Sequence, residues 1–173
     1  MNPGLARDEK GNTNMLQRLE RERDASDLFI HIFNHETAAP RGIQLDGLIR
    51  FLHESLKPWE DTLEDIRRGL DYALSPAPGR GGFVVVGMIG DEVVGAVVVL
   101  GTGMGGYVPG HLLLFAAVAP DRRGQGIGRE LVDRAVACAD GDIALHVEYD
   151  NPARRLYERV GFGSDYAEMR YRR

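Results

Sequence analysis

A glycine-rich turn between an apolar run and an amphipathic stretch constrains the fold of this chain more than any other feature. The apolar run covers residues 112–120, the turn reads Asp-Arg-Arg-Gly-Gln-Gly-Ile-Gly-Arg over residues 121–129, and a helical pattern covers residues 127–139. This order predicts a strand that passes through a tight turn into a helix. Glycines let the backbone approach an anion closely, and N–H groups at a helix start can point at it. The sequence therefore predicts an anion-binding cradle at the end of a strand.

The spacing of the glycines separates this turn from other phosphate-binding loops. A dinucleotide-binding turn carries Gly-x-Gly-x-x-Gly and a P-loop carries Gly-Lys followed by Ser or Thr, and the turn has neither pattern. A solvated turn that only permits an abrupt change from strand to helix is the alternative. The chain has a formal net charge of −5. In such an acidic chain an anionic ligand is favoured by a cluster of arginines: Arg122, Arg123, Arg129, Arg154 and Arg155.

Two segments resemble the signatures of one family. The run Val118-Ala119-Pro120-Asp121-Arg122-Arg123-Gly124-Gln125-Gly126-Ile127-Gly128 resembles the acyl-coenzyme A binding motif of the GNAT acetyltransferase superfamily, Arg/Gln-x-x-Gly-x-Gly/Ala. Residues 151–162 resemble the second GNAT signature, Asn-x-x-Ala-x-x-Leu-Tyr-x-x-x-Gly-Phe, in register from Ala153 onward. Counting back from Ala153, the family asparagine falls on Asp150, while Asn151 lies one residue later. Either residue could take its role.

The resemblance implies that acetyl-coenzyme A is the co-substrate and that no metal is needed. The amides of the turn would hold the coenzyme A diphosphate, and the backbone of the preceding strand would pair with the pantetheine arm. The cofactor-binding residues expected on this basis are Ala116, Val118, Arg123, Gly124, Gln125, Gly126, Ile127, Gly128, Arg129, Asp150, Asn151 and Tyr157.

The resemblance also implies acetyl transfer to an amine. A neutral amine would attack the thioester, and a hydrogen-bond donor would protonate the departing thiolate. Tyr157 lies where the family has this general acid. The glutamate that some members carry on the fourth strand would fall near Leu112, where this chain has no carboxylate. The remaining candidate bases are Glu148, His146 and His111, and an amine that enters neutral would need none.

The pattern of apolar residues agrees with an α/β (α+β) fold over about residues 27–173. Strands are predicted at residues 27–34, 83–89, 93–100, 111–118 and 143–149, and residues 163–173 are compatible with closing antiparallel strands. The strand at 111–118 is apolar enough to be buried on both faces. Helices are predicted at residues 45–56, 63–74, 127–139 and after Pro152, which Asp150 or Asn151 would cap. The GNAT fold implies a central mixed, mostly antiparallel sheet of six to seven strands, flanked by about four helices.

The length of 173 residues suits one domain. We expect residues 1–26 to be an N-terminal extension, partly disordered or helical, before an acetyltransferase domain over residues 27–173. The start of the chain lacks the apolar core of a signal peptide, and no apolar run approaches the roughly 20 residues of a membrane helix. The single cysteine, Cys138, excludes an internal disulfide and is expected to be buried. These features favour a cytoplasmic protein with no membrane partner.

The acceptor is less constrained than the donor. The acidic balance favours a cationic acceptor, for which a small primary amine is the first choice and a peptide N-terminus or lysine the alternative, and it disfavours nucleic acid as a partner. Trp59 could line the acceptor pocket or fill the core. In the glycine-rich loop over residues 101–110 and just after it, Tyr107 and His111 could contact the acceptor, or the loop could be a plain connection.

Three further hypotheses concern metal, partner and cofactor. His31 and His35 lie four residues apart in a predicted strand with no third ligand nearby, so no metal is assigned. A catalytically silent domain that binds acyl-coenzyme A and regulates a partner is the main alternative to an enzyme, because the strand glutamate is missing. A nucleotide-binding domain is a third hypothesis, and the chain could form a homodimer.

Overall fold

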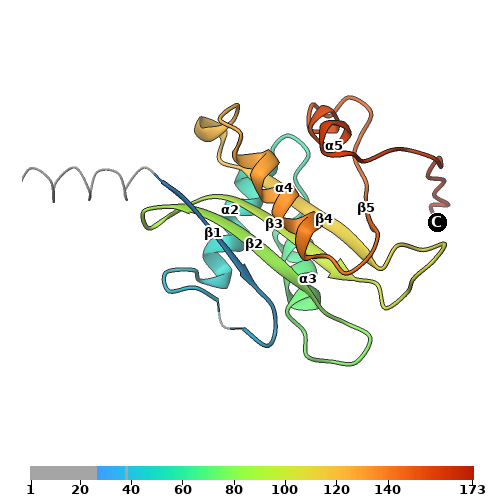
Figure 1. The fold of residues 1–173 in the computed structure, drawn as a ribbon, viewed down its shortest axis with the longest axis horizontal. Coiled ribbons are helices and arrows are strands. Elements are labelled where there is room, and N and C mark those ends of the chain that lie inside the picture. The colour runs from blue at the N-terminus through green and yellow to red at the C-terminus, as the bar shows by residue number, and fades with distance from the viewer. Residues whose placement is uncertain (1–26, 38) are drawn as a thin grey trace, which may run out of the picture.

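The computed structural model describes residues 27–37 and 39–173. The N-terminal extension predicted over residues 1–26 lies outside these residues. The described helices and strands, labelled in Figure 1, are β1 (Leu28–Phe33), α2 (Leu45–Leu56), α3 (Leu63–Ala73), β2 (Gly82–Ile89), β3 (Glu92–Gly101), β4 (His111–Val118), α4 (Ile127–Cys138), β5 (Ile143–Leu145) and α5 (Arg154–Val160). A short 3-10 helix, η1 (Pro120–Arg122), lies between β4 and α4.

The strands form one sheet in the order β1-β2-β3-β4-β5. Neighbours pair antiparallel except β4 and β5, which are parallel, so the predicted mixed, mostly antiparallel sheet with about four helices is confirmed for the described residues. The predicted number of strands is wrong, because the sheet has five strands instead of six or seven.

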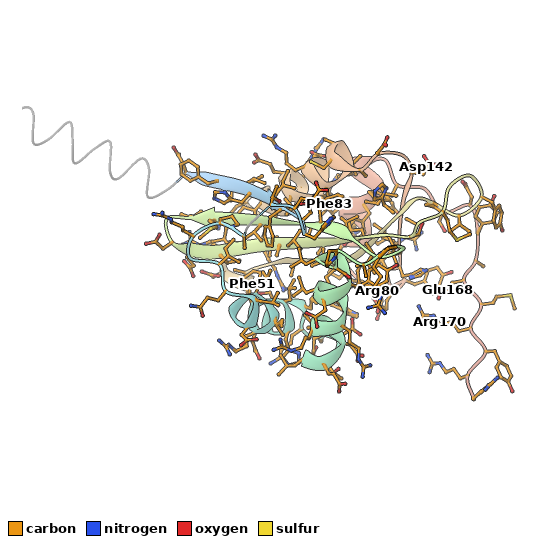
Figure 2. The ribbon with its side chains drawn as sticks, turned by 90° about the horizontal axis from the view of Figure 1, so that it is seen from below. Phe51, Arg80, Phe83, Asp142, Glu168 and Arg170 are labelled. Carbon is orange, nitrogen blue, oxygen red and sulfur yellow. The ribbon has the colours of Figure 1, made fainter. Side chains whose placement is uncertain are left out.

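The difference in strand number lies at the C-terminal end of the chain. Residues 163–173 form no strand, and Figure 2 shows Glu168 and Arg170 on this segment, outside the sheet. Its large apolar side chains, Tyr166, Met169 and Tyr171, are 76–93% exposed. Their alternation resembles that of a strand, but no described surface buries them, and burial is what stabilises an edge strand.

Helices cover both faces of the sheet, with α2 and α3 on one side and α4 and α5 on the other (Figure 1). Successive residues of the central strands point to opposite faces. Val84, Val86 and Val98 therefore pack in the core under α2 and α3. Val85, Val97 and Val99 pack in the core under α4 and α5.

A bulge in the middle of β4 changes the faces to which its side chains point. Val98 on β3 pairs with Phe115 and the next residue, Val99, pairs with Leu113, so Leu114 is the extra residue. Phe115 packs in the core under α2 and α3, and Leu113 packs in the core under α4 and α5. The prediction of burial on both faces holds only in part, because alternate residues of β4 are half-buried.

A glycine in α3 lets this helix lie directly against the bulge. A Cβ atom at Gly69 would lie 2.5 Å from Cδ2 of Leu114 and 2.8 Å from Cε2 of Phe115. Both distances are far below a van der Waals contact. Any larger residue at this position would push α3 away from the middle of β4.

The parallel pairing of β4 with β5 stops beside the bulge. It joins His111 to Ile143, Leu112 to Ala144 and Leu113 to Leu145, and goes no further. The strand predicted over residues 143–149 therefore ends at Leu145, and residues 146–151 form a loop before α5. Residues 115–118 of β4 pair with β3, but no strand among the described residues pairs with their other edge. The second half of β4 thus has one open backbone edge that leads to the glycine turn.

Packing of α4 on the sheet depends on Leu131, which is fully buried and lies close to Gly87 and Gly95. We expect Leu131→Ala to lower the free energy of unfolding by about 2–5 kcal/mol, because it removes buried methyl groups and leaves a cavity. Val136→Ala, on the same helix at a position that is 39% exposed, should change it by less than about 1 kcal/mol. Urea denaturation measures both, and equal losses would contradict this packing.

Candidate functional site

The glycine turn in which the sequence predicts a cradle connects β4 to α4 through η1. Gly124 and Gly126 have φ angles of 77° and 88°, in the left-handed region that side chains disfavour. Gly126 is the N-cap residue of α4 and provides no side-chain cap. The turn therefore requires glycine at both positions because of its backbone conformation.

The backbone N–H groups of this turn are free. The first intrahelical bond of α4 runs from Glu130 N to Gly126 O at 3.1 Å, and within the described part of the chain no hydrogen bond uses the N–H of residues 123–129. Such a series of N–H groups, with left-handed residues at the positive end of a helix, binds anions well. The geometry fits a phosphate or diphosphate group.

The arginines of the turn are held by other parts of the protein. Arg123 donates from Nη2 to the carbonyl of Ser55, at 2.7 Å, and from Nε to the carbonyl of Val118, at 3.3 Å. Arg122 lies near Glu92 and Asp121, at 3.9 and 3.6 Å, and Arg129 lies 3.5 Å from Asp133. Arg123 is thus directed at carbonyls of the protein, while the backbone amides of the turn stay free within the described residues.

Tyr157 lies on α5, with its side chain in the core under α4 and α5. The residue is only 8% exposed, and its ring meets the edge of Phe162 with centroids 5.8 Å apart. Burial, and to a lesser degree the charge of Glu148, raise the pKa of Tyr157 to about 12. The phenol is thus protonated near neutral pH and can donate a proton.

Glu148 lies in the loop between β5 and α5 and is held by Asn151. The Nδ2 atom of Asn151 donates to Oε2 of Glu148 at 3.4 Å, and Oδ1 of Asn151 accepts from Ala153 N at 2.9 Å. Asn151 therefore orders the turn that leads into α5. The predicted cap by Asp150 or Asn151 is wrong, because α5 begins at Arg154, its N-cap residue is Ala153 and no side chain caps it. Asp150 is exposed.

A second carboxylate, Asp61 in the connection between α2 and α3, experiences the charge of Glu148. Burial raises the pKa of Asp61, and the negative charges of Asp65 and Glu148 raise it further. The charge of Glu148 thus acts on both Asp61 and Tyr157, which belong to separate parts of the chain. Sequence reasoning missed Asp61, because no motif marks it and only the fold brings it near Glu148.

The other candidate residues lie apart from this group. His111 begins β4, its ring centroid is 6.3 Å from that of Phe83, and its backbone N–H donates to Asp142 O at 3.1 Å. Its Nδ1 atom is buried and has no hydrogen-bond partner among the described residues. His146 is exposed. Of the candidate bases, Glu148 is the one whose charge acts on Tyr157, whereas His111 lies beside Phe83.

Two aromatic candidates and the cysteine are less buried than a core position requires. Trp59 is half-buried between α2 and α3 and belongs to neither core cluster. Tyr107 is 85% exposed, and its ring meets that of Tyr166 with centroids 5.9 Å apart. Cys138 is exposed at the end of α4, so the expectation of a buried thiol is wrong.

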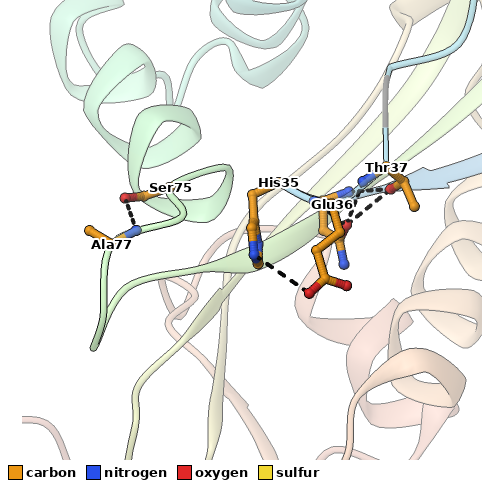
Figure 3. Close-up of polar contacts among 6 residues, drawn as sticks. His35, Glu36, Thr37, Ser75 and Ala77 are labelled. Carbon is orange, nitrogen blue, oxygen red and sulfur yellow. Dashed lines mark hydrogen bonds and ion pairs between the residues drawn. The ribbon is translucent and has the colours of Figure 1, made fainter.

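No metal site is apparent in the described ranges. Figure 3 shows His35 beside Glu36, with 3.8 Å between Nε2 and Oε1. Within residues 27–37 and 39–173 no three His, Cys, Asp or Glu residues are placed to hold a metal ion. No helix in these ranges combines the length and apolarity that a membrane span needs.

Comparisons with known proteins agree with this geometry. The family model of the acetyltransferase (GNAT) domain matches residues 80–163, which contain β2 to β5, the glycine turn and α5. A search of curated proteins found no match.

Solved structures extend the likeness to most of the chain. An aminoglycoside N-acetyltransferase in complex with coenzyme A is 15% identical, with a TM-score of 0.60 over 86% of this chain and 95% of that one. A GNAT-family acetyltransferase from Streptococcus pneumoniae is 19% identical, with a TM-score of 0.59 over 85% and 98%. A transcriptional regulator from Bacillus halodurans is 21% identical, with a TM-score of 0.57 over 83% and 99%. These likenesses show a shared fold.

Two glycines of the turn provide a matched test of the cradle. Gly126 has a positive φ, whereas a Cβ at Gly128 would meet Leu156 Cδ2 and Val118 Cγ2 at an ordinary 3.4 Å. Gly126→Ala should therefore weaken coenzyme A binding about tenfold or more, because the strained backbone moves its N–H groups. Gly128→Ala should change the affinity by less than about threefold. Calorimetric titration with coenzyme A measures both, and equal effects would contradict this description of the turn.

Proposed function

Because residues 80–163 form a GNAT acetyltransferase domain in a chain with the GNAT fold, we propose that this protein is an N-acetyltransferase. It transfers the acetyl group of acetyl-coenzyme A to the primary amine of a small molecule, and the amine attacks the thioester directly. The observation that carries the proposal is the series of free N–H groups over residues 123–129 at the end of an open strand edge. The acetyltransferase domain extends over residues 27–173.

The donor would bind along β4 and the turn. Pantetheine carries amide groups, and the open edge of residues 115–118 offers backbone partners at Ala116 and Val118. The turn amides of Arg123, Gly124, Gln125, Gly126, Ile127, Gly128 and Arg129 would hold the diphosphate. Asp150 or Asn151 would contact the coenzyme near Tyr157.

The proposed chemistry uses the buried phenol as the acid. The amine nitrogen attacks the thioester carbonyl, a C–N bond forms and the C–S bond breaks. Tyr157, whose phenol is protonated at neutral pH, gives its proton to the departing sulfur. The proton lost by the amine passes to Glu148 directly or through water. Glu148 then releases that proton to solvent, and the Tyr157 phenolate takes one up from solvent. Bond changes and protons balance without a metal.

Negative charge beside Tyr157 supports a cationic acceptor. The negative charges of Asp65 and Glu148 repel the charged form of Asp61 and raise its pKa. A protonated amine nearby would relieve that repulsion. The solved aminoglycoside N-acetyltransferase makes a small amine a reasonable first class. A peptide N-terminus or lysine is the alternative acceptor. A cytoplasmic location and a homodimer belong to the same proposal.

A catalytically silent regulatory domain is the second candidate, because residues 112–114 of β4 are all leucine and the family glutamate is absent. Thiol release with a panel of amines, measured beside calorimetric binding of coenzyme A, separates the two. The enzyme should release thiol with at least one amine. Tight coenzyme A binding without turnover on any amine or peptide would favour the silent domain. Protection in thermal melts by ATP or NAD but not by coenzyme A would reject both.

The acid role of Tyr157 predicts a selective loss of turnover. Tyr157→Phe should lower kcat about 100-fold, because the departing thiolate loses its proton donor. The dissociation constant for coenzyme A should change less than about twofold, since the ring stays packed. Tyr149→Phe is the matched control: Tyr149 is 86% exposed, and its variant should turn over normally. An unchanged kcat in Tyr157→Phe would remove this residue as the acid.

The raised pKa of Tyr157 also predicts a dependence of stability on pH. Burial raises the pKa of Tyr157 from 10.0, the ordinary value of a tyrosine, to about 12 in the folded protein, so folding favours the protonated phenol. That contribution is complete below pH 10 and is lost as the pH rises from 10 to about 12. Over this range the wild type should lose more unfolding free energy than Tyr157→Phe, by up to about 1.4 kcal/mol per pH unit. Equal slopes in urea denaturation would show that the phenol titrates normally.

A further inference from the structure

Arg123, the first residue of the glycine motif, is bound to two carbonyls of the protein. Its Nη2 donates to Ser55 O on α2 at 2.7 Å, across 68 positions of sequence, and its Nε donates to Val118 O at the end of β4 at 3.3 Å. We propose that Arg123 is a positioning residue, which ties the glycine turn to α2 and β4 so that the backbone amides of the turn are held ready for the diphosphate. This inference rests on the function proposed above.

The contact with α2 satisfies a group that the helix cannot satisfy itself. Ser55 is the penultimate residue of α2 (Leu45–Leu56), and the last four carbonyls of a helix have no intrahelical partner. Ser55 is also buried, at 5% exposure, and is the buried polar residue of the described core. A buried carbonyl without a donor would cost about 1–3 kcal/mol. A guanidinium is well suited here, because positive charge is favoured at a helix C-terminus.

The contact with Val118 fixes the other side of the turn. Val118 O lies at the end of β4, and Arg123 follows it by five residues, so one side chain closes the turn on itself. Gly124 and Gly126 have little intrinsic preference for one conformation. The N–H groups of residues 123–129 have no internal acceptor to orient them. Without Arg123 the turn would sample more conformations, and binding would have to order it.

The donors of Arg123 are directed at carbonyls, which distinguishes positioning from ligation. A residue that bound the diphosphate mainly through charge could be replaced by lysine. A residue that bridges two carbonyls in fixed directions could not, because an ammonium on a flexible stem lacks the planar fork. The two roles therefore predict different results for the same pair of substitutions.

The same contact links the two halves of the proposed site. The chain after Ser55 leads through Trp59 to Asp61, whose pKa is raised by burial and by the charges of Asp65 and Glu148. The carbonyl of Asp61 also lies 2.9 Å from His53 Nδ1, on the last turn of α2. Arg123 thus joins the donor-binding turn to the helix end that carries the acceptor-side loop.

The test compares Arg123→Lys and Arg123→Met with Arg67→Met. Arg67, on α3, also bonds to α2, through Asp46 Oδ1 at 2.6 Å, but it lies outside the turn. Coenzyme A affinity is measured by calorimetry over a range of salt concentrations. Both Arg123 variants should bind about tenfold more weakly and to a similar degree, with the salt dependence of the wild type. The KM for acetyl-coenzyme A should rise while kcat at saturation changes little. Arg67→Met should bind normally.

Hydrogen exchange without coenzyme A keeps this proposal separate from the function. In Arg123→Met the amides of the turn and of the last turn of α2 should exchange about tenfold faster than in the wild type, and in Arg67→Met the turn should be unchanged. Near-wild-type affinity in Arg123→Lys, together with a weaker salt dependence in Arg123→Met, would identify a direct ionic ligand and overturn the proposal. Unchanged exchange and affinity in both variants would overturn it as well. If Arg123→Met exchanges faster than the wild type as predicted, but the wild type binds no coenzyme A, the proposed function alone fails.

Discussion

The structure depends on the way in which β4 changes its pairing. Along its whole length β4 pairs antiparallel with β3, but its parallel pairing with β5 stops at Leu113, next to the bulge at Leu114. A buried strand normally satisfies both backbone edges, because unpaired polar groups are costly away from water. The open edge of residues 115–118 therefore leaves backbone groups without a strand partner. A ligand with amide groups of its own could pair with them. Pantetheine is such a ligand, and the edge leads to the free amides of the glycine turn.

Electrostatics divides the proposed site into two parts. The turn at the start of α4 presents positive partial charges from the N–H groups of residues 123–129. On the other side, Glu148 raises the pKa of Tyr157 after burial has done so, and it also acts on Asp61. An anionic donor and a cationic acceptor suit these two fields. The phenol of Tyr157 lies within the negative part, where it stays protonated at neutral pH.

The sequence predicted the elements that depend on local patterns, and it missed what depends on contacts between distant segments. The glycines at 124 and 126 needed a positive φ, and the sequence marked them as a turn. By contrast, the strand expected over residues 143–149 ends at Leu145, and residues 163–173 stay outside the sheet although their apolar residues alternate. The sequence could not predict the roles of Asp61 and Ser55. A carboxylate in a loop and a serine in a helix form no motif, and only the packing of α2 beside the turn brings Ser55 to Arg123.

The central claim is that the free amides of the turn bind coenzyme A. Two-dimensional NMR of the backbone amides during titration with coenzyme A tests it most directly. The account predicts that the N–H resonances of residues 123–129 shift strongly and saturably, and that NAD leaves them in place. Resonances that stay unchanged in this segment while coenzyme A binds elsewhere would contradict it.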